Sequence, residues 1–195
     1  MPRPADPAAQ AFLTARRSVP ARLLVEPGPD AAQRRWLIEH ALRVPDHGAL
    51  APWRLLSLDG ASKLRFGERL AARALARDPH LAEDKREKER LRYTYAPWVL
   101  VVVAHIDEQH PKIPAQEQLL SAGCVAYNLL LGAQALGFGA QWLTGWAAYD
   151  AEVAALLGLS TPERVVGFVH IGSAGSVTAE RSRPAAAAKV SAWTD

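Results

Sequence analysis

The sequence predicts an α+β domain in which helices cover both faces of a mixed sheet. Apolar runs of strand length occur at residues 53–58, 97–104 and 165–172, and the segments between them have helical spacing. We therefore expect three or four strands among five or six helices. The 195 residues are 49% hydrophobic, which is enough for one sizeable core. Length favours a single domain over residues 1–195, with residues 174–195 as a C-terminal extension, although two small domains are compatible with it.

Charge and cysteine content argue against several classes of protein. The net charge at pH 7 is +3, and acidic and basic residues alternate, most densely over residues 83–92. This pattern predicts a solvated helix face and no nucleic-acid patch. One cysteine cannot form an intramolecular disulfide, and the N-terminus has no apolar signal-peptide core, so we expect a cytoplasmic protein.

The first element is a predicted helix over residues 7–16, and Arg16, Arg17 and Ser18 follow at its end before Pro20. Two guanidiniums and a hydroxyl at such a junction could bind an anion, because arginine presents a fork of donors matched to phosphate oxygens. The alternative is a solvated helix end with cations near its dipole. Composition alone favours this alternative, since arginine is frequent throughout the chain.

A second helix is expected after Asp30, a suitable N-cap, and should end before Pro45. The loop that follows contains two prolines and a glycine and leads into the first predicted strand. Arg43, Asp46 and His47 lie in this loop at a strand edge, where ligand contacts are common. A lone loop histidine is more often a simple hydrogen-bonding residue, so both interpretations stay open here.

Residues 62–76 and 83–91 predict two more helices, and the run at 97–104 predicts a strand covered on both faces. The histidines and acidic residues at 105–111 are too close together for a metal site, so we expect a surface turn and no metal. Residues 150–157 predict a short helix. No dinucleotide-binding glycine motif, Walker loop or Ser-His-Asp order is recognisable.

The uncharged stretch at residues 119–149 predicts a central helix that ends at Gly137. Roughly nineteen uncharged residues could span a membrane, but polar residues interrupt the stretch and no basic flank follows it, so we expect a buried helix and no membrane contact. Small residues on this helix, such as Gly123 and Gly132, would let other groups approach on several sides. Cys124 lies among them and is expected to be a buried, inert thiol.

Five motifs occur along the chain in a fixed order. They are Arg16-Arg17-Ser18; Arg43-Val44-Pro45-Asp46-His47 followed by Pro52-Trp53; Ser121-Ala122-Gly123-Cys124; Gly137-Phe138-Gly139 through Trp142-Leu143-Thr144-Gly145; and Val166-Gly167-Phe168-Val169-His170-Ile171-Gly172. Together they resemble the nitroreductase family, and in particular its compact members, over about residues 12–172. The resemblance implies a three-layer sandwich with a mainly antiparallel sheet. It also implies an intertwined homodimer that holds two FMN molecules at the subunit interface, with the long helix at its centre.

The resemblance also implies site residues. Arg16 and Ser18 match positions that bind the phosphate and ribityl end of FMN, and Arg17 belongs to the same motif. Arg43 and His47 match cofactor contacts that can come from the other subunit. The segment along the isoalloxazine ring corresponds to Trp142, Leu143 and Thr144, although relatives often have arginine in place of Leu143. Arg181 and Arg183 resemble a C-terminal phosphate clamp, and a stretch assigned to nicotinamide binding corresponds to Gly132, Ala133, Gln134, Ala135, Leu136 and Gly137.

The implied function is an FMN-dependent NAD(P)H oxidoreductase with a ping-pong mechanism. NAD(P)H would deliver hydride to flavin N5 and leave, and a nitroaromatic, quinone or similar electron-poor acceptor would then take its place. Because a flavin carries the redox chemistry itself, the sequence needs no catalytic acid-base pair. Three alternatives stay open: a relative with different flavin chemistry, a flavin-binding storage or regulatory protein without turnover, and a cofactor-free basic binding domain.

Overall fold

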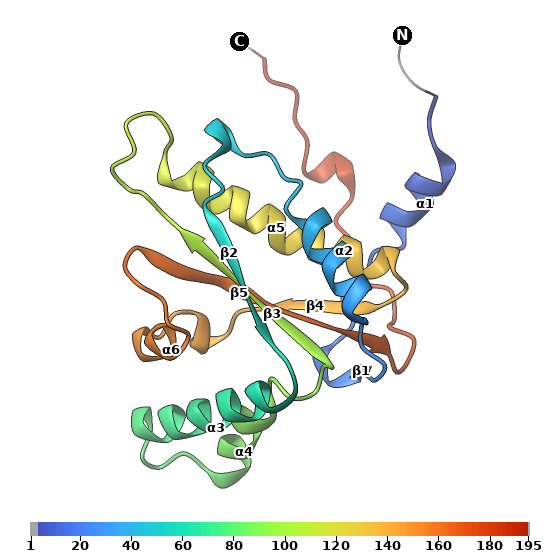
Figure 1. The fold of residues 1–195 in the computed structure, drawn as a ribbon. Helices are drawn as coiled ribbons and strands as arrows, with labels where there is room; N and C mark the ends of the chain where they lie inside the picture. The colour runs from blue at the N-terminus through green and yellow to red at the C-terminus, as the bar shows by residue number, and fades with distance from the viewer. Residues whose placement is uncertain (1–3, 195) are drawn as a thin grey trace.

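The computed structural model describes residues 4–194 and shows one sheet between two layers of helices (Figure 1). The strand order is β1-β5-β3-β2, and β4 also pairs with β5. Every strand pair in this part of the chain is antiparallel, which confirms the mainly antiparallel sheet. The strands are β1 (Leu24–Val25), β2 (Trp53–Leu58), β3 (Trp98–His105), β4 (Gly139–Leu143) and β5 (Glu163–Ala174).

The helices α2 and α5 cover one face of the sheet, and α3 and α6 cover the other, with α4 packed against α3 (Figure 1). Each face has its own apolar core. The helices are α1 (Pro7–Thr14), α2 (Ala31–Ala41), α3 (Gly60–Arg77), α4 (Glu83–Leu91), α5 (Ala115–Ala135) and α6 (Ala151–Leu156). Short 3-10 turns occupy Ala21–Leu23, His47–Ala49, Trp146–Ala148 and Ala186–Ala188.

Strand β3 separates the two cores and is buried on both faces, as its continuous apolar sequence predicts. Val101 points into the core with α3 and α6, whereas Leu100 points into the core with α2 and α5, and both are 0% exposed. This alternation follows from the two-residue period of a strand. The prediction for β2 is confirmed as well, since this strand begins at Trp53 and ends at Leu58.

Helix α5 ends where the sequence predicts. Leu136 caps it, and Gly137 follows with φ of +81°, a left-handed conformation that glycine adopts without steric cost. Its inner face is buried against the sheet, whereas Leu120 is 60% exposed. The prediction of a buried Cys124 is wrong, because the thiol lies on this outer face and is exposed. A helix-to-sheet contact buries only one side, and Cys124 points away from it.

Two strands were not predicted. Strand β4 has a mixed sequence of aromatic, amide and small residues, and it becomes a strand by pairing with β5, where Ala140 lies opposite Ile171. Gly139 is required at its start, since a Cβ there would lie 2.9 Å from side-chain atoms of Val19 and Leu24. Strand β1 is two residues long and too short to give a periodic pattern.

Beyond β5 the chain continues to residue 194 with no further strand. Figure 1 shows both ends of the described chain on the side of the sheet that carries α2 and α5. The side chain of Trp193 in this C-terminal extension is 87% exposed. None of the helices within residues 4–194 has the length and apolar character needed to cross a membrane.

Candidate functional site

The motif at residues 16–18 lies beside β4. It follows α1 and leads into Val19, whose backbone N–H donates to the carbonyl oxygen of Ala140 at 3.0 Å. Strand β4 continues into residues 142–144, so two segments that are distant in sequence become neighbours. The structure thus brings the predicted phosphate-binding motif next to the strand that carries the predicted flavin-ring segment.

Arg17 contacts the C-terminal extension. Its Nη2 donates to the carbonyl oxygen of Ala179 at 2.6 Å, and its Nη1 lies 3.6 Å from Oε1 of Glu180. Nη2 of Arg183 lies 3.6 Å from the same carboxylate oxygen. The structure therefore gathers Arg17 and Arg183 around the carboxylate of Glu180, and their role in binding a phosphate stays a prediction.

Two buried polar atoms at this contact lack a hydrogen-bond partner among the described residues: Nε of Arg17 and Oγ1 of Thr178. A buried donor without a partner costs about 1–3 kcal/mol. Both atoms can donate to an oxygen, so they fit a bound group with several acceptor oxygens, such as a phosphate. Arg16 and Ser18 are half-buried, and Arg181 is exposed.

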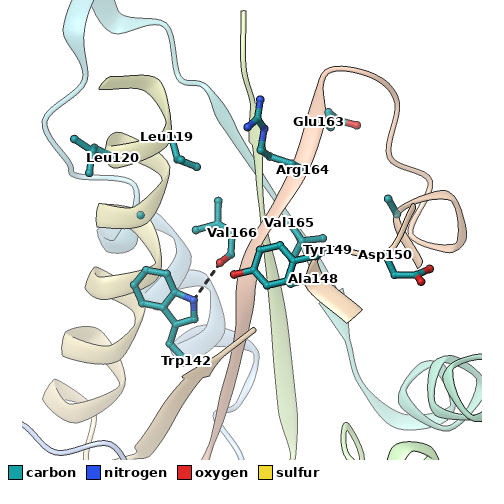
Figure 2. Close-up of a pocket in the computed structure, with 12 residues that line it drawn as sticks. Leu119, Leu120, Trp142, Ala148, Tyr149, Asp150, Glu163, Arg164, Val165 and Val166 are labelled. Atoms are coloured by element: carbon teal, nitrogen blue, oxygen red, sulfur yellow. Dashed lines mark hydrogen bonds between the residues drawn. The ribbon is translucent and has the colours of Figure 1, made fainter. Parts of the chain in front are cut away.

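Trp142 of β4 lines an apolar pocket of about 590 Å³. Its Nε1 donates to the carbonyl oxygen of Val166 at 3.3 Å, and a Cβ on Gly167 would overlap the indole. Figure 2 shows the indole on one side of the pocket and the ring of Tyr149 near Val166. Leu119, Leu120 and Gly123 of α5 line another side. The pocket is therefore suited to a flat apolar group.

Arg92 is a residue that the sequence analysis did not single out and that lies beside the predicted site. Gly145 directly follows the predicted flavin-ring segment with φ of +68°, and a Cβ there would lie 3.3 Å from Nη1 of Arg92. Nη2 of Arg92 and Nε1 of Trp146 both donate to the carboxylate of Glu89. Nε of Arg92 is buried without a partner in the described chain. The charged run at residues 83–92 is thus not wholly a solvated face, since its end forms a cationic pocket of about 460 Å³ with Trp146.

The loop with Arg43 and His47 lies on α5, away from the Arg17 contact. Oγ of Ser121 donates to the Pro45 carbonyl at 2.6 Å, and Nδ2 of Asn128 donates to the Arg43 carbonyl at 3.1 Å. His47 Nδ1 lies 2.7 Å from Oε2 of Glu117. The side chains of Arg43 and His47 are exposed. Within one chain, they are not brought to the other predicted cofactor residues.

The predicted nicotinamide stretch lies at the far end of α5. Gly132 and Ala135 line a pocket of about 220 Å³ between α1, α2 and α5, and Nε2 of Gln134 donates to the Phe12 carbonyl at 2.6 Å. Gly123 lies opposite Trp142, and a rise of 1.5 Å per residue separates it from Gly132 by about 13 Å. The nicotinamide role therefore stays a prediction, and one chain does not bring this stretch to Trp142.

Comparisons with known proteins agree with this architecture. A model of the nitroreductase family matches residues 13–173. A Haemophilus influenzae protein provisionally named NAD(P)H nitroreductase is 37% identical over 170 residues, which cover 87% of this chain and 90% of its own length. The Escherichia coli K12 protein YdjA, with the same provisional name, is 33% identical over 163 residues, covering 83% of this chain and 86% of its own.

Solved structures show the same fold. A Bacteroides fragilis nitroreductase crystallised with bound FMN superposes with a TM-score of 0.69, covering 93% of this chain and 97% of that one. The two sequences are 22% identical, so the similarity is one of fold.

Proposed function

This chain belongs to the nitroreductase family, and from that premise we propose that it is an FMN-dependent oxidoreductase. It uses NAD(P)H to reduce small electron-poor acceptors such as nitroaromatics and quinones. The observation that carries this proposal is the clamp of Arg17 and Arg183, with its unpaired donors at Nε of Arg17 and Oγ1 of Thr178. FMN held there would supply the chemistry of hydride transfer between NAD(P)H and the acceptor.

The residues of this chain bind and orient the cofactor. Arg16, Arg17, Ser18 and the arginines of the C-terminal extension hold its phosphate, because guanidinium forks match phosphate oxygens. The segment Trp142-Leu143-Thr144 would lie along its ring. Leu143 would offer an apolar contact within this segment.

Arg92 supplies N–H donors at the end of the ring segment. Its guanidinium lies against Gly145 and is held by the carboxylate of Glu89, which neutralises part of its charge. N–H donors fixed at this position would stabilise negative charge that develops during reduction, and they need no reorganisation when the charge appears. The chain therefore needs no catalytic acid-base pair, and no metal is part of the proposal.

A second copy of this chain completes the site. Leu119, Leu120 and Tyr127 expose 39%, 60% and 43% of their surface on one face of α5, and adjacent exposed apolar side chains mark an interaction surface. The loop with Arg43 and His47 is fixed to the same helix, so a partner packed on α5 receives these side chains at its own flavin. The chain is therefore proposed to act as a homodimer.

Sedimentation of Leu120→Glu tests the homodimer. A carboxylate on α5 should convert the dimer into monomers, because an unpaired charge cannot be buried in an apolar interface. Leu64→Glu on α3 is the matched control, since Leu64 is 47% exposed on the other side of the sheet. Equal sedimentation of both variants with the wild type would contradict this arrangement.

The visible absorption spectrum tests the cofactor and the activity. The purified protein, with FMN added, should show protein-bound flavin bands that bleach when NADPH or NADH is added without oxygen. Adding a nitroaromatic or a quinone should then restore the bands. Bound FMN that both nucleotides leave oxidised would instead identify a flavin storage or regulatory protein. Failure to bind FMN would rule out the proposed function.

A further inference from the structure

The carboxylate of Glu180 occupies the centre of the proposed phosphate clamp. Its Oε1 accepts a hydrogen bond from the backbone N–H of Arg181 at 2.8 Å and lies 3.6 Å from both Nη1 of Arg17 and Nη2 of Arg183. These neighbours, with the Arg181 N–H first, lower the pKa of Glu180 below its ordinary value of 4.5, so the carboxylate is ionised at neutral pH. One backbone donor and two guanidiniums around an anionic oxygen also make a suitable environment for phosphate.

We propose that Glu180 is a built-in competitor for the cofactor phosphate, and that the C-terminal extension thereby sets the affinity of the clamp for FMN. In the free protein the carboxylate partly neutralises Arg17 and Arg183. When FMN binds, its phosphate displaces Glu180 from the guanidiniums. This inference rests on the proposed function, because that function supplies the phosphate ligand.

The geometry favours exchange over permanent closure. Both guanidinium contacts are at 3.6 Å, and the Glu180 side chain is 68% exposed, so the carboxylate is held loosely. It leaves Nε of Arg17 and Oγ1 of Thr178 without partners. A phosphate has more acceptor oxygens and more negative charge than a carboxylate, so it can use donors that Glu180 does not reach.

Competition follows from charge. If Glu180 stayed in place beside a bound phosphate, the two anions would repel each other while sharing the same arginines. If it leaves, its contacts with those arginines are lost. Either way, the negative charge at residue 180 weakens binding of the phosphate, and its removal strengthens that binding.

The test is the affinity of Glu180→Gln for FMN and for riboflavin, which lacks the phosphate. Glutamine keeps the size of the side chain and an oxygen that can accept from Arg181. Flavin fluorescence at low ionic strength should show FMN binding about threefold to tenfold more tightly than in the wild type, the effect of losing two exposed ion pairs. Riboflavin affinity should be unchanged. Glu68→Gln, an exposed glutamate on α3, removes the same charge on the other side of the sheet and should change neither affinity.

Equal FMN affinity in Glu180→Gln and the wild type would overturn the inference, as would a variant that binds FMN and riboflavin more tightly to the same degree. Inorganic phosphate separates this inference from the proposed function. Its stabilising effect on thermal unfolding should be larger in Glu180→Gln than in the wild type whether or not FMN binds. A protein that shows this difference without binding FMN would refute the flavin function and keep the anion clamp, whereas equal stabilisation would refute the competitor.

Discussion

The inner and outer sides of α5 differ in how completely a single chain buries their apolar side chains and pairs their polar groups. On the inner side Leu129 is 0% exposed. Gln118, also buried, uses its amide fully, donating to the carbonyls of Asp107 and Ile113 and accepting from the Asp107 N–H. On the outer side Leu120 is 60% exposed. The inner side serves the fold, whereas one chain leaves the outer side exposed, where we propose that a second copy packs.

The C-terminal extension resembles the outer side of α5 in this respect. Where it crosses the residue 16–18 motif, Arg17 and Thr178 each keep a buried polar atom without a partner in the described chain. A folded core rarely tolerates such atoms, because each loses its hydrogen bonds to water. Among the described residues, unsatisfied buried atoms occur on Arg17 and Thr178, where a ligand is proposed, on Arg92 beside Gly145, and on His170 inside the sheet.

The largest effect should come from truncating the inner side of α5. Leu129→Ala leaves a cavity against the sheet and should lower the free energy of unfolding by about 3–4 kcal/mol. Leu120→Ala, the same change on the outer side, should cost a monomer less than about 0.5 kcal/mol. Urea unfolding at several protein concentrations measures both. If the loss of unfolding free energy in Leu120→Ala is larger and grows with protein concentration, a second chain covers the outer side. If Leu120→Ala and Leu129→Ala lose the same free energy at all concentrations, the two sides of α5 do not differ in the way described.

His170 tests the buried core on the α3 side of the sheet through pH. It is 0% exposed, stacks on Tyr93, and neither ring nitrogen has a partner among the described residues. Burial first, then the charges of Arg92 and Lys63, lowers its pKa from 6.5 to about 4. The unfolded chain therefore binds a proton near pH 6.5 that the folded chain refuses until about pH 4.

The free energy of unfolding should consequently be highest above pH 6.5 and should fall as the pH drops toward 4. The total decrease is at most about 3 kcal/mol, at 1.36 kcal/mol per pKa unit. Urea unfolding across this range measures the slope. His170→Phe keeps an aromatic ring against Tyr93 and should flatten it. An unchanged slope in this variant would assign the acid sensitivity to other groups.

Arg17→Ala directly probes the contact between the residue 16–18 motif and the C-terminal extension. Loss of a guanidinium that binds phosphate should weaken FMN binding by about 2 kcal/mol, or roughly thirtyfold, since hydrogen bonds between charged groups contribute about 1.5–3 kcal/mol. Fluorescence titration measures the change, and Arg69→Ala, an exposed arginine on α3, is the control. Similar FMN affinities in the two variants would remove Arg17 from the clamp.

The sequence predicts the packed sheet and helices better than it predicts the candidate site. Strand β3 and the end of α5 at Gly137 follow from local patterns, because continuous burial and a helix-ending glycine both appear in consecutive residues. Strand β4 depends on pairing with β5, which no local pattern records. Arg92 was missed for a related reason, since only folding brings it against Gly145. Likewise, no local pattern indicates that Glu180 lies between Arg17 and Arg183.

The smallest effect should come from an ion pair at the rim of the Trp142 pocket. Arg54 on β2 donates from Nε and Nη2 to the two carboxylate oxygens of Glu163 on β5, and this bond, ahead of smaller contributions, lowers the pKa of Glu163 to about 2. A carboxylate with a lowered pKa stabilises the fold above its unfolded pKa of 4.5, and the stabilisation is lost as the pH falls toward 2.

Arg54→Met should cost about 1 kcal/mol at neutral pH, because Arg54 is partly exposed and solvent screens the pair. Acid unfolding should become less steep between pH 4.5 and 2. If FMN affinity in this variant fell as far as in Arg17→Ala, the rim of the pocket would belong to the cofactor site. Unchanged affinity would show that this ion pair serves fold stability alone.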